Sequence, residues 1–332
     1  MRMVKRCLLI LALVAARPVG AAAAPAPHTA AEKSQAWRTA AAGILIARAD
    51  ANSLATAAAL RFVGAANAKA AVGAPNLRAS AVELAARASD LAPQSASIGW
   101  LHLQLCAATP ACDIRDVATV MRWVDADNAA AWLQTLAAAQ RDRDSTDIDR
   151  ILGDMALGAR FDLYWNRIVV LMVDALDAVG YELPSGYAES DSARLATVSA
   201  IASAEIIPPF TALVEVCRDS SAAPERRDVC LKLSKTMQRS DTVAAQLAGY
   251  SLAKRLLAPD SKEARTSAER RHVLEWRVAE AAKFDSALMP WTKNTRARAR
   301  LAQMRTLPRE EDVCIAILKA HKMALEPPEV HP

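Results

Sequence analysis

The sequence contains little glycine and few aromatic residues: among 332 residues there are ten glycines, four phenylalanines and four tyrosines. It also lacks stretches in which β-branched or aromatic residues alternate with polar ones, which is the pattern of a half-buried strand. Hydrophobic residues nevertheless make up 53% of the chain, and much of this share is alanine, the residue with the highest helix propensity. These features together predict an all-α protein.

Motifs that mark catalytic or cofactor sites are also missing. The chain has no G-x-S-x-G nucleophile elbow, no G-x-G-x-x-G turn and no phosphate-binding loop. The sequence therefore predicts no catalytic residue and no cofactor. A Ser-His-Asp triad is defined by its geometry in the fold, so the sequence neither predicts nor excludes one.

Metal-binding patterns are absent too. The five histidines form no H-E-x-x-H motif and no other pair four residues apart, and the cysteines form no C-x-x-C pair. The histidines are His28, His102, His272, His321 and His331. We expect no metal site and interpret His102 as a structural residue.

The N-terminus has the pattern of a secretory signal peptide. Three basic residues within Met1–Arg6 precede the apolar run Cys7–Ala16, and small residues follow at Ala21–Ala24. We expect residues 1–24 to be removed, with cleavage near Ala23 or Ala24. The sequence thus predicts export to a bacterial periplasm or beyond.

Removal of this segment changes the net charge of the chain. Residues 1–24 contain four basic residues and no acidic one, so subtracting these four charges reduces the formal +5 of the chain to +1. A nearly neutral mature chain gives no indication of a nucleic-acid partner. The apolar run is too short to leave a transmembrane anchor.

Three tryptophans mark passages in which a turn leads into a predicted helix. Trp100, Trp132 and Trp165 are 32 and 33 residues apart, a period typical of stacked helical hairpins. The middle passage is the clearest: Asp127 and Asn128 can cap a helix that continues through three alanines. A single hairpin cannot bury its apolar face, so neighbours are expected to stack on it.

The stretch Val124–Trp132 resembles the start of the first helix of a tetratricopeptide repeat. The likeness is looser at Leu91–Gly99 and faint at Phe161–Trp165. It covers roughly residues 76–180, about a third of the chain. The resemblance implies two to four degenerate repeats in an α-solenoid that binds a peptide or a partner helix; a generic array of helical hairpins is the alternative.

The best candidate for a domain boundary is the segment Gly180–Ser192, which concentrates glycine, proline, serine and tyrosine. We therefore expect an N-terminal repeat region over residues 25–180 and a C-terminal helical domain over residues 181–332. Helices are predicted near residues 32–49, 53–66, 77–89, 162–178, 188–204, 208–216, 224–238, 241–257, 261–283, 286–304 and 308–325. Asn76 is expected to cap the helix from residue 77, Asp144 or Ser145 a helix that carries Ile148 to Met155, and Ser240-Asp241 the helix from residue 241.

Five cysteines remain after signal removal, in a compartment where disulfides persist. Cys106 and Cys112 flank one predicted bend, and Cys217 and Cys230 flank another. We predict a disulfide within each pair, the second stabilising the fold by roughly 3 kcal/mol in the chain-entropy description. Cys314 remains either as a buried thiol or as the source of an intermolecular disulfide.

The densest basic run is Lys293–Arg305, whose arginines do not all share one helix face. We interpret it as a solvated helix, with an anionic contact surface as the alternative. For the whole chain, the first hypothesis is an exported repeat protein that binds a protein or peptide partner in the cell envelope without catalysis. The alternatives are an all-α periplasmic enzyme with an unrecognised site and a passive spacer; the sequence does not specify the oligomeric state.

Overall fold

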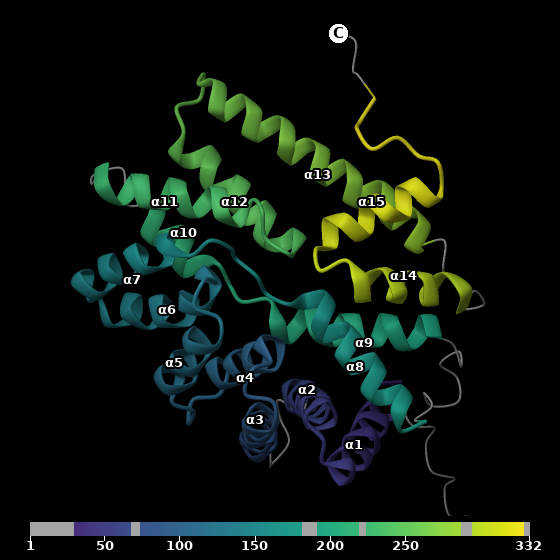
Figure 1. The fold of residues 1–332 in the computed structure, drawn as a ribbon. Helices are drawn as coiled ribbons and strands as arrows, with labels where there is room; N and C mark the ends of the chain where they lie inside the picture. Colours follow the sequence, from purple (N-terminus) through teal and green to yellow (C-terminus); the bar gives the residue numbers. More distant parts are fainter. Residues whose placement is uncertain (1–29, 68–73, 181–190, 219–223, 287–293, 329–332) are drawn as a thin grey trace, which may run out of the picture.

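The computed structural model describes residues 30–67, 74–180, 191–218, 224–286 and 294–328. The helices of the first half are α1 (Ala30–Arg48), α2 (Ala51–Asn67), α3 (Ala74–Leu91), α4 (Ala96–Ala107), α5 (Ile114–Val124), the 3-10 helix η1 (Ala129–Trp132), α6 (Leu133–Asp142), α7 (Ser145–Leu157) and α8 (Trp165–Ala178). Those of the second half are α9 (Asp191–Ile206), α10 (Thr211–Arg218), α11 (Pro224–Met237), α12 (Val243–Leu256), α13 (Lys262–Ser286), α14 (Asn294–Thr306) and α15 (Glu310–Ala320) (Figure 1).

The fold is all-α, as predicted, and within the described ranges there is no strand. The one isolated β-bridge described joins Asn128 to Arg160. The predicted signal peptide, residues 1–24, lies outside the described residues. No helix in the described part of the chain combines the length and apolar character needed to cross a membrane.

Short polar residues start several helices as predicted. The Asn128 side chain accepts a hydrogen bond from the backbone N–H of Ala130 at 3.1 Å, and Asp144 accepts one from Asp147 at 3.0 Å. Each cap provides an acceptor for a backbone donor that has no partner within its own helix. These local interactions confirm the predicted starts of η1 and α7.

Two other predicted caps are wrong. Helix α3 already begins at Ala74, so Asn76 lies inside its first turn. Helix α12 is capped by Thr242, whose hydroxyl accepts the N–H of Ala245. Asp241, the predicted cap, is instead used by a distant segment, because a long-range contact outcompetes the local one.

Helices that follow one another in sequence pack against one another from α1 to α5 and from η1 to α7. Contacts between distant helices join the halves: α2 packs on α8 and α9, α6 on α10, and α7 on α11. Helices α8 and α9 lie side by side in the middle, between α2 and α14 (Figure 1). The structure thus shows pairwise helix packing, while a regular solenoid is not confirmed.

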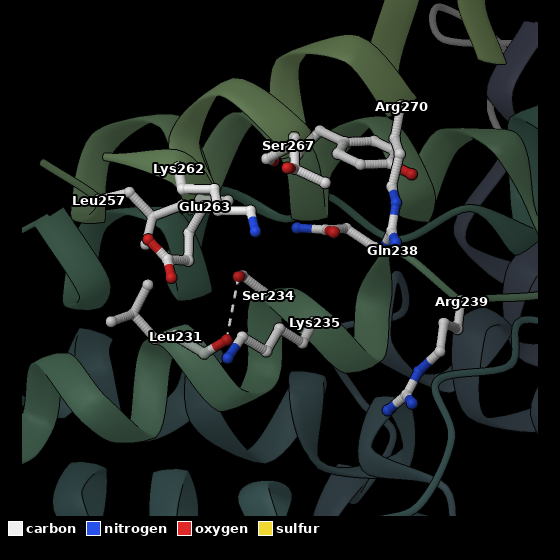
Figure 2. Close-up of a pocket in the computed structure, with 13 residues that line it drawn as sticks. Leu231, Ser234, Lys235, Gln238, Arg239, Leu257, Lys262, Glu263, Ser267 and Arg270 are labelled. Carbon is white, nitrogen blue, oxygen red and sulfur yellow. Dashed lines mark hydrogen bonds between the residues drawn. The ribbon is translucent and has the colours of Figure 1, made fainter. Parts of the chain in front are cut away.

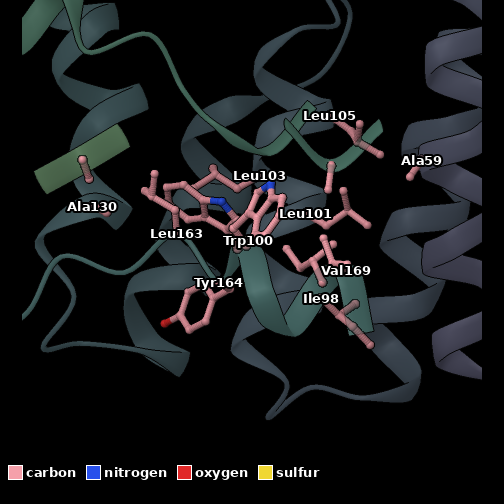
Figure 3. Packing of buried hydrophobic residues seen from close by; sticks show 14 of the residues in the cluster. Ala59, Ile98, Trp100, Leu101, Leu103, Leu105, Ala130, Leu163, Tyr164 and Val169 are labelled. Atoms are coloured by element: carbon pink, nitrogen blue, oxygen red, sulfur yellow. The ribbon is translucent and has the colours of Figure 1, made fainter. Parts of the chain in front are cut away.

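The three tryptophans that mark the hairpins have different environments. Trp100 is fully buried in α4, and its ring is 6.4 Å from that of Tyr164 (Figure 3). Trp165 is 6% exposed and donates its indole N–H to Ser203 at 3.1 Å. Trp132 is half-buried at the end of η1, with the Arg122 guanidinium 4.2 Å from its ring centroid. All three contribute to packing, as large rings at helix crossings do.

A buried polar group anchors the segment between α7 and α8. The Asn128 amide donates to the Asp162 carbonyl at 2.9 Å and accepts the Asp162 N–H at 2.9 Å. The Tyr164 hydroxyl donates to the Asp125 carboxylate, which Arg160 also contacts. These bonds hold an irregular segment that would otherwise have unpaired buried backbone groups.

The same segment is held from the other half of the chain by Asp241. Its two carboxylate oxygens accept the backbone N–H groups of Leu163 at 2.8 Å and Tyr164 at 2.7 Å. The Asp241 carbonyl accepts the Glu310 N–H at 2.8 Å, and the Glu310 carboxylate accepts the Val243 N–H at 2.7 Å. Two buried carboxyl groups therefore connect the α7–α8, α11–α12 and α14–α15 turns.

Disulfides join Cys106 to Cys112 and Cys217 to Cys230, the pairs expected from the sequence. The first closes the bend between α4 and α5, and the second joins the end of α10 to α11. The remaining thiol, Cys314, is partly buried in α15. Its burial raises the pKa of the thiol to about 11, so very little reactive thiolate is present at neutral pH.

Helices α11 and α12 approach closely at Gly249, and this contact provides a test of their packing. A Cβ at residue 249 would lie 2.7 Å from the Met237 Cβ and 2.8 Å from the Ser234 carbonyl oxygen. We expect Gly249→Ala to lower the free energy of unfolding by about 1–3 kcal/mol, because the helices must separate. Urea unfolding followed by circular dichroism measures this change.

Gly153 in α7 is the matched control, since a Cβ there meets nothing within 4 Å. Gly153→Ala is expected to raise stability by up to about 1 kcal/mol through helix propensity. Equal effects of the two substitutions would contradict the close packing of α11 on α12.

Candidate functional site

Three cavities lie around the C-terminal helices α10 to α13. The first, which we call the α11–α13 pocket, has a volume of about 460 Å³ and is lined by residues of α11, α12 and α13. Helix α13 lies above α11 and α12 in Figure 1 and packs on α12, and its N-terminal half forms one wall of the pocket. The long α13 helix thus creates the cavity by packing on α12 while leaving space above α11.

Basic side chains dominate the charge of the α11–α13 pocket. Lys235 comes from α11, Arg239 from the turn that follows α11, and Lys262 and Arg270 from α13. Glu263 is the one acidic residue of the lining. Lys262 and Arg270 both belong to α13, and both line the pocket.

These four cations form no ion pair with a carboxylate in the part of the chain that the structure describes. Many other surface arginines are paired, for example Arg150 with Asp147 at 2.5 Å and Arg277 with Glu311 at 2.8 Å. Like charges around one cavity raise the local positive potential and attract anions. The pocket therefore has the electrostatic character of an anion-binding site.

Polar groups add hydrogen-bonding capacity to this charge. Figure 2 shows Lys262 and Arg270 extending from α13 toward Ser234 on α11 and toward Gln238, which directly follows α11. The Ser234 hydroxyl donates to the Leu231 carbonyl at 3.0 Å, so its oxygen is fixed in position. The Gln238 amide offers a further donor. A carboxylate in this space would meet two cations and neutral donors at once.

Tyr250 separates the α11–α13 pocket from a second cavity of about 470 Å³ on the other side of α13. Burial raises the pKa of its hydroxyl, and the nearby Glu311 carboxylate adds to this rise. The phenol is therefore a neutral group at physiological pH. It contributes an apolar ring to both cavities, which share Ser267 as a second common lining residue.

The second cavity contains His272. Glu275 also lines it, but Glu275 is held by Arg271 at 2.8 Å. Among the described residues no hydrogen bond joins His272 to Glu275 or to Ser267.

His102 and the buried carboxyl pair lie away from the three cavities. Burial lowers the pKa of His102, and the nearby Asp90 carboxylate opposes this change. Burial raises the pKa of Asp241 to about 8 and also raises that of Glu310. Both carboxyl groups accept backbone N–H bonds, and this structural role accounts for their burial.

The predicted basic run is only partly a free surface. Arg298 of α14 pairs with Asp191 of α9, and Arg305 pairs with Asp174 of α8. Arg300 is half-buried, and desolvation lowers its pKa. These contacts bind α14 to its neighbours, and Lys293 lies outside the described residues.

Sequence reasoning did not identify the α11–α13 pocket. The structure places Lys235 on the pocket wall, without an ion pair to any carboxylate that the structure describes. The presence of Lys262 and Arg270 on one predicted helix could have indicated a basic surface. The sequence could not show which helix would face these residues.

The fold and the pocket define a class: an all-helical protein with a basic interhelical cavity and two disulfides. The chain matches no known protein family, no curated protein and no solved structure in the comparisons made. Its function must therefore be inferred from its own residues.

Proposed function

We propose that this chain is an exported binding protein of the cell envelope, and that the α11–α13 pocket receives an acidic segment of a protein or peptide partner. The observation that carries the proposal is the group of four cations around one cavity, none of which forms an ion pair with another described residue. No catalytic step is part of it.

The proposed compartment has independent physical support. Two disulfides are consistent with an oxidising environment. The N-terminal pattern of basic residues, apolar run and small residues adds the expected route of export. Together they favour a periplasmic or secreted location.

We also propose that helices α3 to α7 are degenerate tetratricopeptide-like hairpins. Consecutive helices in this region pack on one another, with α4 on α5 and α6 on α7. Such hairpins form frameworks that present binding surfaces. In this chain they support α10 and α11, because α6 contacts α10 and α7 contacts α11.

An acidic peptide suits the pocket better than a neutral one for electrostatic reasons. Desolvating Lys262 and Arg270 with a neutral ligand would bury two cations without compensation. A carboxylate provides that compensation and makes charge-assisted hydrogen bonds. The attraction is screened by salt, with a Debye length of about 8 Å at physiological ionic strength.

Fluorescence anisotropy with a labelled glutamate-rich peptide tests the proposal. We expect binding that weakens as salt is raised. The double variant Lys262→Gln, Arg270→Gln is expected to bind at least about tenfold more weakly, because each charged hydrogen bond contributes roughly 1.5–3 kcal/mol. A glutamine-rich peptide of equal length is the ligand control.

The matched protein control is Lys232→Gln, Lys319→Gln, which removes the same charge from two exposed residues outside the three cavities. It should bind like the unchanged protein. Capture of partners from envelope extract with the protein and with each double variant extends the test to natural ligands. Equal peptide affinity of both double variants would contradict the assignment of the pocket.

A further inference from the structure

A third cavity, of about 510 Å³, lies beside the Cys217–Cys230 disulfide. Three arginines line it, and we call it the arginine pocket: Arg218 ends α10, Arg227 lies in α11 and Arg255 lies in the last turn of α12. The other lining residues are apolar, and no acidic residue is among those that line the cavity.

The arginine pocket is held in place by covalent and hydrogen-bonded contacts. Arg218 directly follows Cys217, and Arg227 precedes Cys230 by three residues, so the disulfide fixes the two helices that carry them. The Arg227 guanidinium donates from Nε at 3.1 Å and from Nη2 at 2.6 Å to the Leu256 carbonyl oxygen. Two bonds to one acceptor fix the plane of the guanidinium.

The fixed guanidinium of Arg227 retains donor capacity. Arginine has five N–H donors, and the bonds to Leu256 use one at Nε and one at Nη2. Arg255 is exposed and has no ion pair among the residues that the structure describes. Arg226, next to Arg227, points elsewhere and pairs with Asp149 at 2.7 Å. The lining therefore brings three arginines together with no acidic residue among the residues that form it.

We infer that the arginine pocket binds a tetrahedral oxyanion, a phosphate or sulfate group. Three guanidinium groups that reach one cavity from three helices suit an anion with several outward oxygens, whereas a carboxylate offers only two. The group can come from a free ion or from a phosphomonoester lipid headgroup. This site does not depend on the acidic-peptide ligand of the α11–α13 pocket.

Arg255→Gln is the decisive variant, because Arg255 is exposed and its removal leaves the Arg227–Leu256 contact in place. Lys254→Gln is the control: it removes the same charge from the adjacent residue, which lines the second cavity instead. Isothermal titration with inorganic phosphate measures the affinity for the free ion. The ionic strength is held constant, and chloride is the reference anion. Co-sedimentation with vesicles of phosphatidic acid and phosphatidylcholine measures binding to the lipid headgroup. Vesicles of pure phosphatidylcholine are the control.

We expect the unchanged protein and Lys254→Gln to bind phosphate, and Arg255→Gln to bind it at least about tenfold more weakly, as for loss of one charged hydrogen bond. Arg255-dependent binding confined to phosphatidic acid vesicles supports the lipid headgroup as the source. If Arg255→Gln equals the unchanged protein in both measurements, or if nothing binds in either, the inference is overturned.

Discussion

Asp241→Ala is expected to lower the free energy of unfolding by about 3 kcal/mol or more, because two buried backbone donors lose their acceptor. These donors are the N–H groups of Leu163 and Tyr164, both bonded to Asp241. Tyr164 adopts a left-handed backbone conformation with φ of 59°, which is costly for a bulky residue unless other contacts hold it. Urea unfolding followed by circular dichroism gives the value.

Asp144→Ala is the control for this substitution. Asp144 also accepts a backbone N–H, but it is exposed and caps only α7. Its loss is expected to cost about 1 kcal/mol, a usual value for an N-cap. Comparable losses for the two substitutions would mean that Asp241 acts only as a local cap.

Asp241 also makes stability depend on pH. Its folded-state pKa is about 8, against 3.8 for an ordinary aspartate, because of burial, with the Asp162 and Glu310 carboxyl groups adding to the rise. The folded protein thus holds a proton that the unfolded chain releases. This contribution to stability is fully present below about pH 4 and is lost as the pH rises through about 8.

The test compares urea midpoints near about pH 6 and about pH 9, where the linkage relation predicts a fall for the unchanged protein. Asp241→Asn cannot titrate, so its fall should be smaller; Glu310, whose pKa burial also raises, should keep part of it. An unchanged slope in Asp241→Asn would show that Asp241 is already ionised across this range.

Trp100→Ala is the second large effect, with an expected loss of about 3–5 kcal/mol, because it leaves a cavity in the centre of the core. Trp100 is 0% exposed and contacts the ring of Tyr164, so it joins α4 to the start of α8. Figure 3 shows it surrounded by apolar side chains of its own helix and of the segment around Leu163. Thermal unfolding detects the loss as a lower Tm.

Trp123→Ala is the matched control, since Trp123 is 74% exposed on α5. The same change of side chain there is expected to alter stability by no more than about 0.5 kcal/mol. A large loss at Trp123 would mean that α5 is covered by a partner or by another copy of the chain.

Local sequence predicted the helical class and several helix starts well. Asn128 and Asp144 cap helices because their acceptors lie within two or three residues of the donors they serve. The cysteine pairs could also be anticipated, since each brackets a short bend: six residues separate Cys106 from Cys112, and 13 separate Cys217 from Cys230. Helix caps and short-range cysteine pairs can be predicted because the residues that form them are close in sequence.

The regular spacing of the three tryptophans did not predict their positions within the helices. Trp100 is central in α4, Trp132 ends η1 and Trp165 begins α8, so equal spacing does not give equal structural positions. The predicted helix from Asp162 begins only at Trp165. The reason is tertiary: Asn128 and Asp241 bind the preceding segment in an extended path.

The sequence by itself thus determined that the chain is all-helical, where many helices begin and which cysteines are close enough to pair, because these properties depend on neighbours a few residues apart. Only the tertiary structure decided that Asp241 serves a turn almost eighty residues away and that Lys235 faces Lys262 and Arg270 across a cavity. Helix periodicity shows which side chains share a face, but the partner of each face is set by how the apolar surfaces of all the helices are buried together.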